Sequence, residues 1–149
     1  MDDKSNEIRI GAIGPIKVVR GDSPQRLAAN SASRIAQTAV ECDDLIALVC
    51  DHSDPLVRME AVPRLKARFP SDSRAQNALV NAVTDVDESV RCVAISAIAD
   101  LALPVAGDLL AAALQDPEPD VRFFAAIGLQ QLGDLRAPDD PETFAYHAT

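Results

Sequence analysis

The side chains that could do chemistry in this sequence are few and scattered. Histidine, the usual acid–base and metal-binding side chain near neutral pH, occurs only as His52 and His147, which are too far apart in sequence to form a local ligand pair. Three cysteines lack CxxC spacing and fall inside apolar helical patterns, so we expect reduced, packed thiols: Cys42, Cys50 and Cys92. No glycine-rich phosphate-binding loop occurs. We therefore expect no catalytic residue, no metal and no cofactor.

Composition excludes further classes of function. The 149 residues include 14 lysines and arginines against 23 aspartates and glutamates, a net charge of −9, with only four phenylalanines and one tyrosine. Nucleic-acid binding needs a positive surface and aromatic stacking, so we expect no nucleic-acid partner. The first ten residues are polar and acidic, unlike a signal peptide, and no apolar run is long enough to cross a membrane. These features predict a cytoplasmic protein without a membrane partner.

One chemical feature does recur, an arginine preceded by valine. The segment "DPLVR" that ends at Arg58 returns as "DESVR" ending at Arg91 and "EPDVR" ending at Arg122, at spacings of 33 and 31 residues. Alanine follows each arginine by three residues and leucine or isoleucine by seven, which is an apolar stripe at helical spacing. A further apolar pair lies thirteen and twelve residues before each arginine. Each repeat unit therefore contains two helices.

The second helix of each unit begins with a capping signal. Asp54 before Pro55 is typical of a helix start, because the carboxylate accepts free backbone amides and proline lacks an N–H that would stay unbonded. Asp87, and Glu118 with Pro119, use the same chemistry. We expect helices near 43–51, 54–68, 73–84, 87–101, 104–115 and 118–132.

A weaker copy of the unit lies upstream. Arg26 is 32 residues before Arg58, and Ser23 before Pro24 supplies another start signal, so a helix is expected over about 24–40. Its first helix is missing, because "IRIGAIGPIKVV" is rich in glycine and β-branched residues, which favours an extended segment. The predicted organisation is an extended arm at 1–21, a repeat domain at 22–133 and a tail at 134–149.

Each end of the chain has two possible arrangements. The strand-like arm either packs along the first helix or pairs with another chain, which would give self-association. In the tail, Phe144 and Tyr146 follow proline turns. They could fold back over Phe123, Phe124 and Ile127 on the last predicted helix and cap the stack, or the tail could be a free peptide for a partner.

The pattern resembles the HEAT-repeat family, including the short bacterial branch that contains the phycobilin-lyase HEAT-like proteins. The resemblance covers about 22–133, and its most specific feature is an aspartate six residues before the arginine, as in Asp85 with Arg91 and Asp116 with Arg122. It implies an all-α fold, a right-handed α-solenoid of about three and a half HEAT-like helical hairpins. It also implies a structural role for the arginines, in a hydrogen-bonded ladder between successive repeats.

The sequence departs from the family pattern at the N-terminal end. His52 stands at the aspartate position opposite Arg58, and Arg20 stands there in the first unit, so we expect an incomplete ladder. Some HEAT enzymes bind iron through His-Glu pairs, but His52 precedes Ser53 and His147 precedes an alanine. The resemblance therefore implies a noncatalytic protein–protein interaction scaffold or adaptor. The alternative is a bilin lyase or isomerase that acts with a second subunit.

Solenoids commonly bind partner proteins along the face formed by the second helices. At 100° per residue, the position after each repeat arginine lies roughly opposite Ala61 and its equivalents on the helix. This geometry predicts an exposed row of apolar side chains. The alternative is that neighbouring helices or the termini cover the row. A basic island on the helix at 54–68 is either a solvated face or a docking point for an acidic partner. The candidate partner-binding residues are Leu27, Met59, Cys92 and Phe123 in the row, and Arg64, Lys66 and Arg68 in the island.

Overall fold

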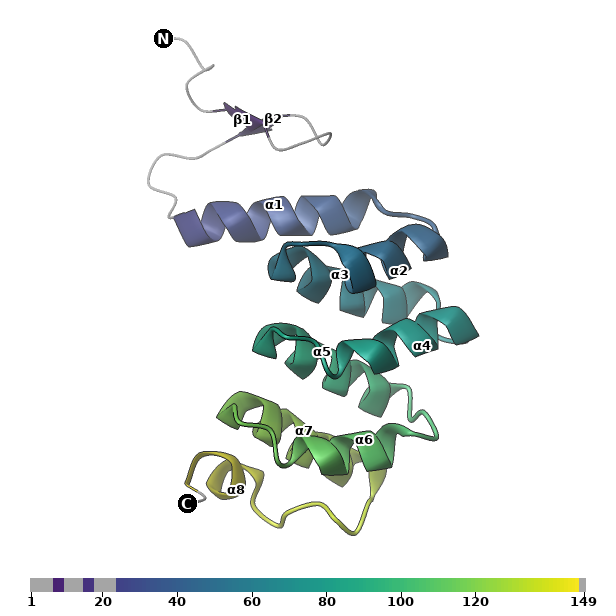
Figure 1. Cartoon of the computed structure of the whole chain (residues 1–149), viewed down its shortest axis with the longest axis vertical. Coiled ribbons are helices and arrows are strands. Elements are labelled where there is room, and N and C mark those ends of the chain that lie inside the picture. Colours follow the sequence, from purple (N-terminus) through teal and green to yellow (C-terminus); the bar gives the residue numbers. More distant parts are fainter. Residues whose placement is uncertain (1–6, 10–14, 18–23, 148–149) are drawn as a thin grey trace.

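Three helical hairpins and one leading helix stack into an elongated solenoid (Figure 1). The structure, a computed structural model, describes residues 7–9, 15–17 and 24–147. Its helices are α1 (Pro24–Thr38), α2 (Cys42–Asp51), α3 (Pro55–Arg68), α4 (Ser73–Ala82), α5 (Glu88–Asp100), α6 (Ala106–Ala113), α7 (Pro119–Leu132) and α8 (Pro141–His147). The predicted all-α solenoid of three hairpins with a leading half is confirmed.

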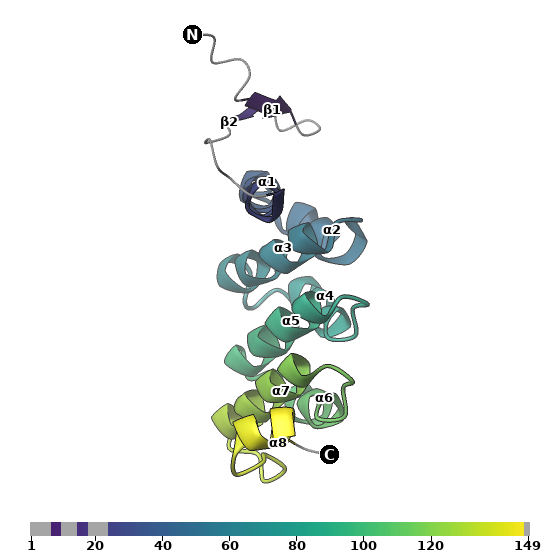
Figure 2. The same cartoon turned by 90° about the vertical axis from the view of Figure 1, so that its left-hand side faces the viewer.

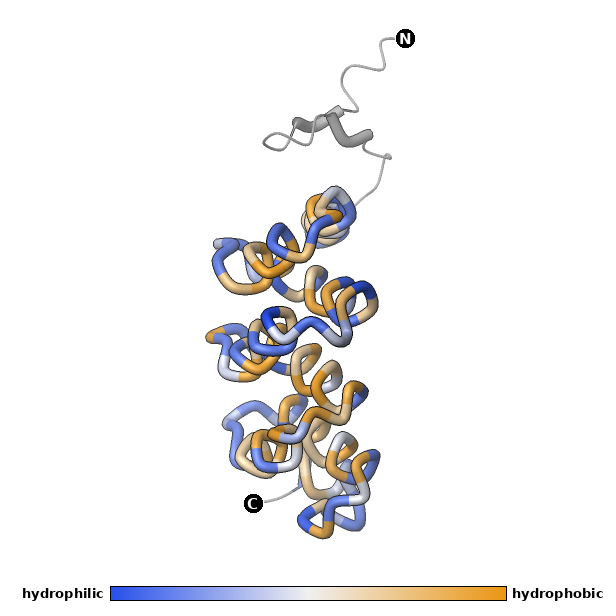
Figure 3. The backbone as a smooth tube through the Cα atoms, turned by 90° about the vertical axis from the view of Figure 1, so that its right-hand side faces the viewer, coloured by the Kyte–Doolittle hydropathy of each residue, from blue (hydrophilic) through white to orange (hydrophobic). Residues whose placement is uncertain are grey.

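The helices form two layers. The second helices α3, α5 and α7 pack on one another in one row, with α1 at its N-terminal end, and α2, α4 and α6 lie beside them in the other row (Figures 1 and 2). Hydrophobic residues gather where helices of neighbouring hairpins meet, while many turns are hydrophilic (Figure 3). This arrangement leaves one continuous face formed by the second helices.

The capping chemistry of the second helices follows the expected pattern with one exception. The carboxylate of Asp54 accepts the Leu56 amide at the start of α3, and that of Asp87 accepts two backbone amides at the start of α5. Glu118 makes no side-chain cap bond, so α7 relies on Pro119 in its first turn. Local sequence therefore determines where the second helices begin.

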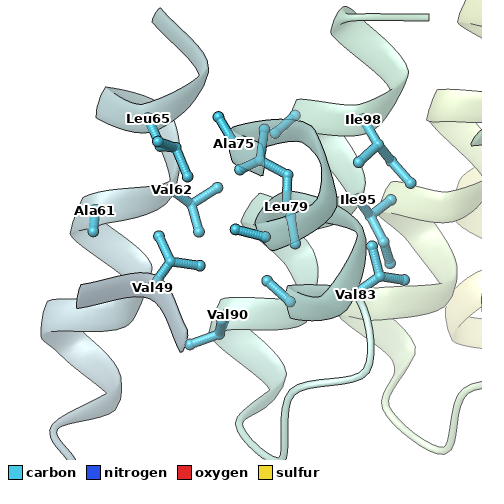
Figure 4. Close-up of a cluster of buried hydrophobic side chains, with 14 of the residues drawn as sticks. Val49, Ala61, Val62, Leu65, Ala75, Leu79, Val83, Val90, Ile95 and Ile98 are labelled. Carbon is cyan, nitrogen blue, oxygen red and sulfur yellow. The ribbon is translucent and has the colours of Figure 1, made fainter. Parts of the chain in front are cut away.

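The core is aliphatic and built from the predicted stripe. The repeated alanines and the Leu or Ile four residues later are fully buried, namely Ala61, Ala94, Ala125, Leu65, Ile98 and Leu129. All of these side chains except Ala125 belong to one cluster, to which Val62, Leu79 and Ile95 also belong (Figure 4). Each fully buried aliphatic side chain of this size contributes about 1.5–3 kcal/mol. The alanines let the helices approach closely.

The N-terminal arm pairs with itself. Strand β1 (Glu7–Arg9) runs antiparallel to β2 (Pro15–Lys17), with Ile8 opposite Ile16. The arm therefore pairs within itself at these residues, an arrangement that differs from both of the expected alternatives. The expected departure at Arg20 and the expected cap at Ser23 lie outside the described residues.

The tail returns across the end of the stack. Gly133 ends α7 with a φ of 67°, a left-handed conformation that suits glycine. The following segment leads to α8, which packs against α7 (Figure 1). The Ala145 side chain is fully buried. The last hairpin therefore has a neighbour on its outer side.

Candidate partner-binding surface

An arginine ladder joins successive hairpins. Arg58 donates from Nε and Nη2 to the two carboxylate oxygens of Asp85 at 2.9 and 3.0 Å, and Arg91 binds Asp116 in the same way at 3.0 and 3.1 Å. All four side chains are between 11 and 14% exposed. Such two-pronged pairs combine charge with fixed geometry. The arginine of one hairpin is thus bound by the aspartate of the next.

Each ladder arginine also binds the turn of its own hairpin. Arg91 Nη1 donates to the backbone carbonyls of Asp85 and Val86 at 2.9 and 3.2 Å. Arg58 makes the equivalent bonds to the carbonyls of His52 and Ser53. The six-residue spacing therefore allows two contacts. Arg91 binds the backbone carbonyl of Asp85, and the carboxylate of Asp85 binds Arg58 of the preceding hairpin.

The ladder is complete at Arg58, although position 52 carries a histidine in place of the aspartate. Arg58 has a complete partner in Asp85, so His52 does not deprive it of an ion pair. His52 instead replaces an aspartate in the turn: its Nδ1 accepts the Asp54 amide at 3.1 Å, as Asp85 Oδ1 accepts the Asp87 amide at 2.9 Å. His52 has a structural hydrogen bond, and the missing carboxylate is the one that would face the preceding unit.

At the C-terminal end α8 supplies the missing acceptor. Arg122 Nη1 donates to the carbonyls of Asp116 and Pro117, and its Nη2 donates to the Ala145 carbonyl at 2.7 Å. A backbone oxygen of α8 thus stands where the aspartate of a following hairpin would be. The implied structural role holds for Arg122 as well as for Arg91.

The described residues contain no cluster of three or more histidine, cysteine or acidic side chains that could bind a metal. Burial raises the pKa of the Cys92 thiol to about 11 and also raises the pKa of Cys42 and Cys50, so these thiols stay protonated near neutral pH.

A groove of about 390 Å³ lies between the second and third hairpins. Its apolar lining includes Val83 and Leu109, and its polar side chains include Asp85, Arg91 and Asp116. The ladder occupies all three of these charged groups. The groove therefore offers no free charge to bind or activate a small molecule.

The predicted apolar row is not an exposed strip. Cys92 is only 8% exposed, so at this position the alternative of a covered row holds, while Leu27, Met59 and Phe123 are half-buried. At the C-terminal end the cover comes from α8, because the Phe123 ring lies 5.7 Å from the Tyr146 ring.

The exposed apolar side chains of α7 are not the ones that the helical period alone selects. The buried positions on α7 are Val121, Ala125, Ala126, Gly128 and Leu129. At about 100° per residue, the direction opposite their mean lies within about 25° of Phe123 and Ile127 and about 80° from Phe124. Phe124 and Ile127 are nevertheless each 39% exposed, whereas Phe123 is half-buried and its ring contacts Tyr146 of α8.

The basic island is largely neutralised within the molecule. Arg64 pairs with Glu60 at 3.3 Å, and Lys66 pairs with Asp100 of α5 at 2.7 Å. Arg68 is exposed and lies 5.9 Å from the centre of the neighbouring Phe69 ring. Two of the three predicted docking charges therefore already have carboxylate partners.

Comparison with known proteins agrees with the repeat architecture. A family model described as HEAT repeats matches residues 76–143, from within α4 to the first turn of α8. This match supports the HEAT-repeat family, whose repeats commonly mediate protein–protein interaction and are generally non-enzymatic. It does not extend to the phycobilin-lyase branch. No curated protein matches the sequence. In the described part of the chain, no helix is long and apolar enough to span a membrane.

Proposed function

We propose that this protein is a noncatalytic scaffold or adaptor that binds a partner protein along the face formed by α3, α5 and α7. The observation that carries the proposal is the placement of Phe124 and Ile127. Within helices α1–α7 as described, these are the exposed large hydrophobic side chains, and both lie on α7. Adjacent exposed apolar side chains on a rigid scaffold are typical of binding surfaces.

The other candidate residues take supporting places in this proposal. Phe123, Met59 and Leu27 are half-buried, and Cys92 is buried. These four residues would shape the surface without making most of its contacts. The basic island of Arg64, Lys66 and Arg68 would form the N-terminal flank of the face, where charge mainly sets orientation and association rate.

Site-specific photocrosslinking in the native cell tests this function. A photoreactive residue would replace Val93, Phe124 or Ile127 on the second helices, and matched variants would carry it at Ala47 or Asn77 on the first helices. We expect one protein to be crosslinked from the second-helix positions and not from the first-helix positions. Equal yields from both sets, or crosslinks from the first helices alone, would contradict the proposal.

The proposal includes the organisation and setting of the chain. Residues 1–21 would form an arm that self-associates, 22–133 the binding scaffold, and 134–149 a tail that caps it, in a cytoplasm that keeps the three free cysteines reduced. Light scattering during size exclusion would compare the full chain with a variant lacking 1–20. Equal monomer masses and equal stabilities would remove any role of the arm in assembly or packing.

A further inference from the structure

We propose that the C-terminal end of this face binds a basic, amphipathic helical segment of a partner protein. The segment would lay its apolar side on Phe124 and Ile127 and place lysines or arginines against Glu88 and Asp120. The inference rests on the proposed function and adds the chemistry of the partner. We call the site the acidic–aromatic surface, formed by Glu88 of α5, Asp120, Phe124 and Ile127 of α7, and Tyr146 of α8.

The α7 part of the surface is one continuous stripe. Asp120, Phe124 and Ile127 are spaced by four and three residues, which puts them in line on one side of the helix. All three are exposed. A carboxylate, an aromatic ring and a branched aliphatic side chain therefore follow one another over about two helical turns.

Helix α8 extends the stripe and fixes its acidic end. Tyr146 Oη donates a hydrogen bond to Asp120 Oδ1 at 2.6 Å. The Phe123 ring lies 5.7 Å from the Tyr146 ring and 5.9 Å from the Phe124 ring, so the three aromatic rings form one cluster beside the carboxylate. An aromatic cluster next to a carboxylate is a favourable site for a lysine or arginine side chain.

The C-terminal half of the chain has an excess of carboxylates. From residue 88 onward it contains three arginines and no lysine, against ten acidic residues: Glu88, Asp100, Asp108, Asp116, Glu118, Asp120, Asp134, Asp139, Asp140 and Glu142. Arg91 is bound by Asp116, Arg122 by backbone carbonyls, and Arg136 by Asp134 and Asp108. The chain's own cations in this half are thus engaged away from Glu88 and Asp120.

Glu88 shows the consequence of this excess. Its hydrogen bond with Glu118 and the charge of that group raise its pKa, with smaller contributions from partial burial, Asp120 and Asp87. Burial is the largest cause of the raised pKa of Cys92, and the charges of Asp120 and Glu88 raise this pKa further. Both carboxylates therefore lie near the Cys92 thiol. Carboxylates held together in this way favour a cation brought by a partner.

The same charges argue against other occupants. A nucleic acid or an acidic peptide would be repelled by Glu88, Glu118 and Asp120. A second copy of the chain could offer the basic island, but Arg64 and Lys66 are already paired with Glu60 and Asp100. Charge complementarity therefore selects a basic segment with apolar residues beside its charges.

Binding of designed peptides to the full chain tests the inference. The probe is a fluorescent helical peptide of about five turns with leucines on one side and lysines on the other. The comparison peptide carries glutamate in place of each lysine. Binding of both is followed by fluorescence anisotropy at low and at high salt. We expect the lysine peptide to bind at least about ten-fold more tightly than the glutamate peptide, with a strong salt dependence.

Matched variants separate a specific site from general attraction to an acidic protein. Glu88→Gln with Asp120→Asn removes two charges from the surface while leaving an acceptor for Tyr146, and Asp44→Asn with Asp139→Asn removes two exposed charges elsewhere. We expect the first pair to weaken lysine-peptide binding about five-fold and the second less than about two-fold. Phe124→Ser should weaken it about ten-fold, against little change for Leu135→Ser in the tail. Ile127→Ser replaces Phe124→Ser if thermal melting shows that the latter is unfolded.

The outcomes distinguish this inference from the function on which it rests. Absent binding of the lysine peptide, tighter binding of the glutamate peptide, or equal weakening by the two charge pairs would each overturn the inference. None of these results changes which helices crosslink to a native partner. Crosslinks from the second helices combined with failure of the lysine peptide would leave the function standing and assign a different partner chemistry.

Discussion

At the residue scale, the ladder arginines show how one side chain can join two hairpins. Arg91 donates to backbone carbonyls of its own turn and to both oxygens of Asp116 in the next hairpin. Both side chains are mostly buried. Removing one partner from such a pair leaves a desolvated charge without a counterion, which is more costly than losing an exposed ion pair.

A double-mutant cycle on the ladder measures this contribution. We expect Arg91→Ala to lower the free energy of unfolding by about 2–4 kcal/mol, and the coupling energy between Arg91→Ala and Asp116→Ala to be about 1–3 kcal/mol. The more exposed pair of Lys66 with Asp100 is the control, with an expected coupling below about 1 kcal/mol. Urea denaturation gives all of these values. Equal coupling in the two pairs would contradict a special role for the ladder.

A second residue-scale prediction concerns the carboxylate of Glu88. Its pKa is raised in the folded protein by Glu118, so the charged form of Glu88 destabilises the fold above that pKa. Glu88→Gln should therefore raise the melting temperature at pH 7, and the gain should shrink as the pH falls through the raised pKa of the folded side chain and vanish below the pKa of the unfolded side chain. Melting curves at pH 7 and pH 4 test this. A stabilisation that grows toward low pH has the wrong sign for this account.

At the element scale, α7 presents two sides that must satisfy different neighbours. Its open side carries Phe124 and Ile127, while Gly128 lies on the buried side against α6. A Cβ atom on Gly128 would collide with Leu110 Cδ2 and come within 3.2 Å of Ala99 Cβ. Leu110 is itself fully buried, so its side chain has little space in which to move.

Gly128→Ala tests how tightly α6 and α7 pack. Alanine favours helix by about 1 kcal/mol over glycine, but overpacking typically costs about 1–3 kcal/mol, so we expect a net loss of about 1–2 kcal/mol in the free energy of unfolding. Adding Leu110→Val should recover part of that loss, although Leu110→Val alone should destabilise. Chemical denaturation of the three variants gives the result. A stabilising Gly128→Ala would show that Leu110 moves aside without cost.

At the scale of the whole molecule, a stack of repeats must end without exposing its core. Helix α8 covers the outer side of α7, buries Ala145 and gives Arg122 its last acceptor. Its Tyr146 also bonds to Asp120 of the acidic–aromatic surface. The same short helix therefore completes both the stack and the proposed binding surface.

Deleting the residues after Gly133 tests the contribution of the tail. We expect a loss of about 3 kcal/mol in the free energy of unfolding, because aromatic and alanine contacts with α7 disappear together. The milder variant Tyr146→Phe removes only one exposed hydrogen bond and should cost less than about 1 kcal/mol. Thermal and urea denaturation would be compared. An unchanged stability after truncation would mean that the tail does not support the stack.

The sequence by itself determined the repeats, most helix starts and the buried stripe. These features are local: an aspartate caps the amides next to it, as Asp54 does, and Ala61 and Leu65 share a helix side because of the helical period. The aspartates six residues before Arg91 and Arg122 also carried the resemblance to the HEAT-repeat family, which implied the ladder.

Only the tertiary structure decided which side of each second helix stays open and which charges stay free. A helix in the row touches its own first helix and two neighbours, and this third contact covers Cys92 and half-buries Phe123 while Phe124 remains open. Lys66 is likewise neutralised by Asp100, which is 34 residues away in sequence. Exposure and charge balance depend on neighbours brought together by stacking, and no local pattern records them.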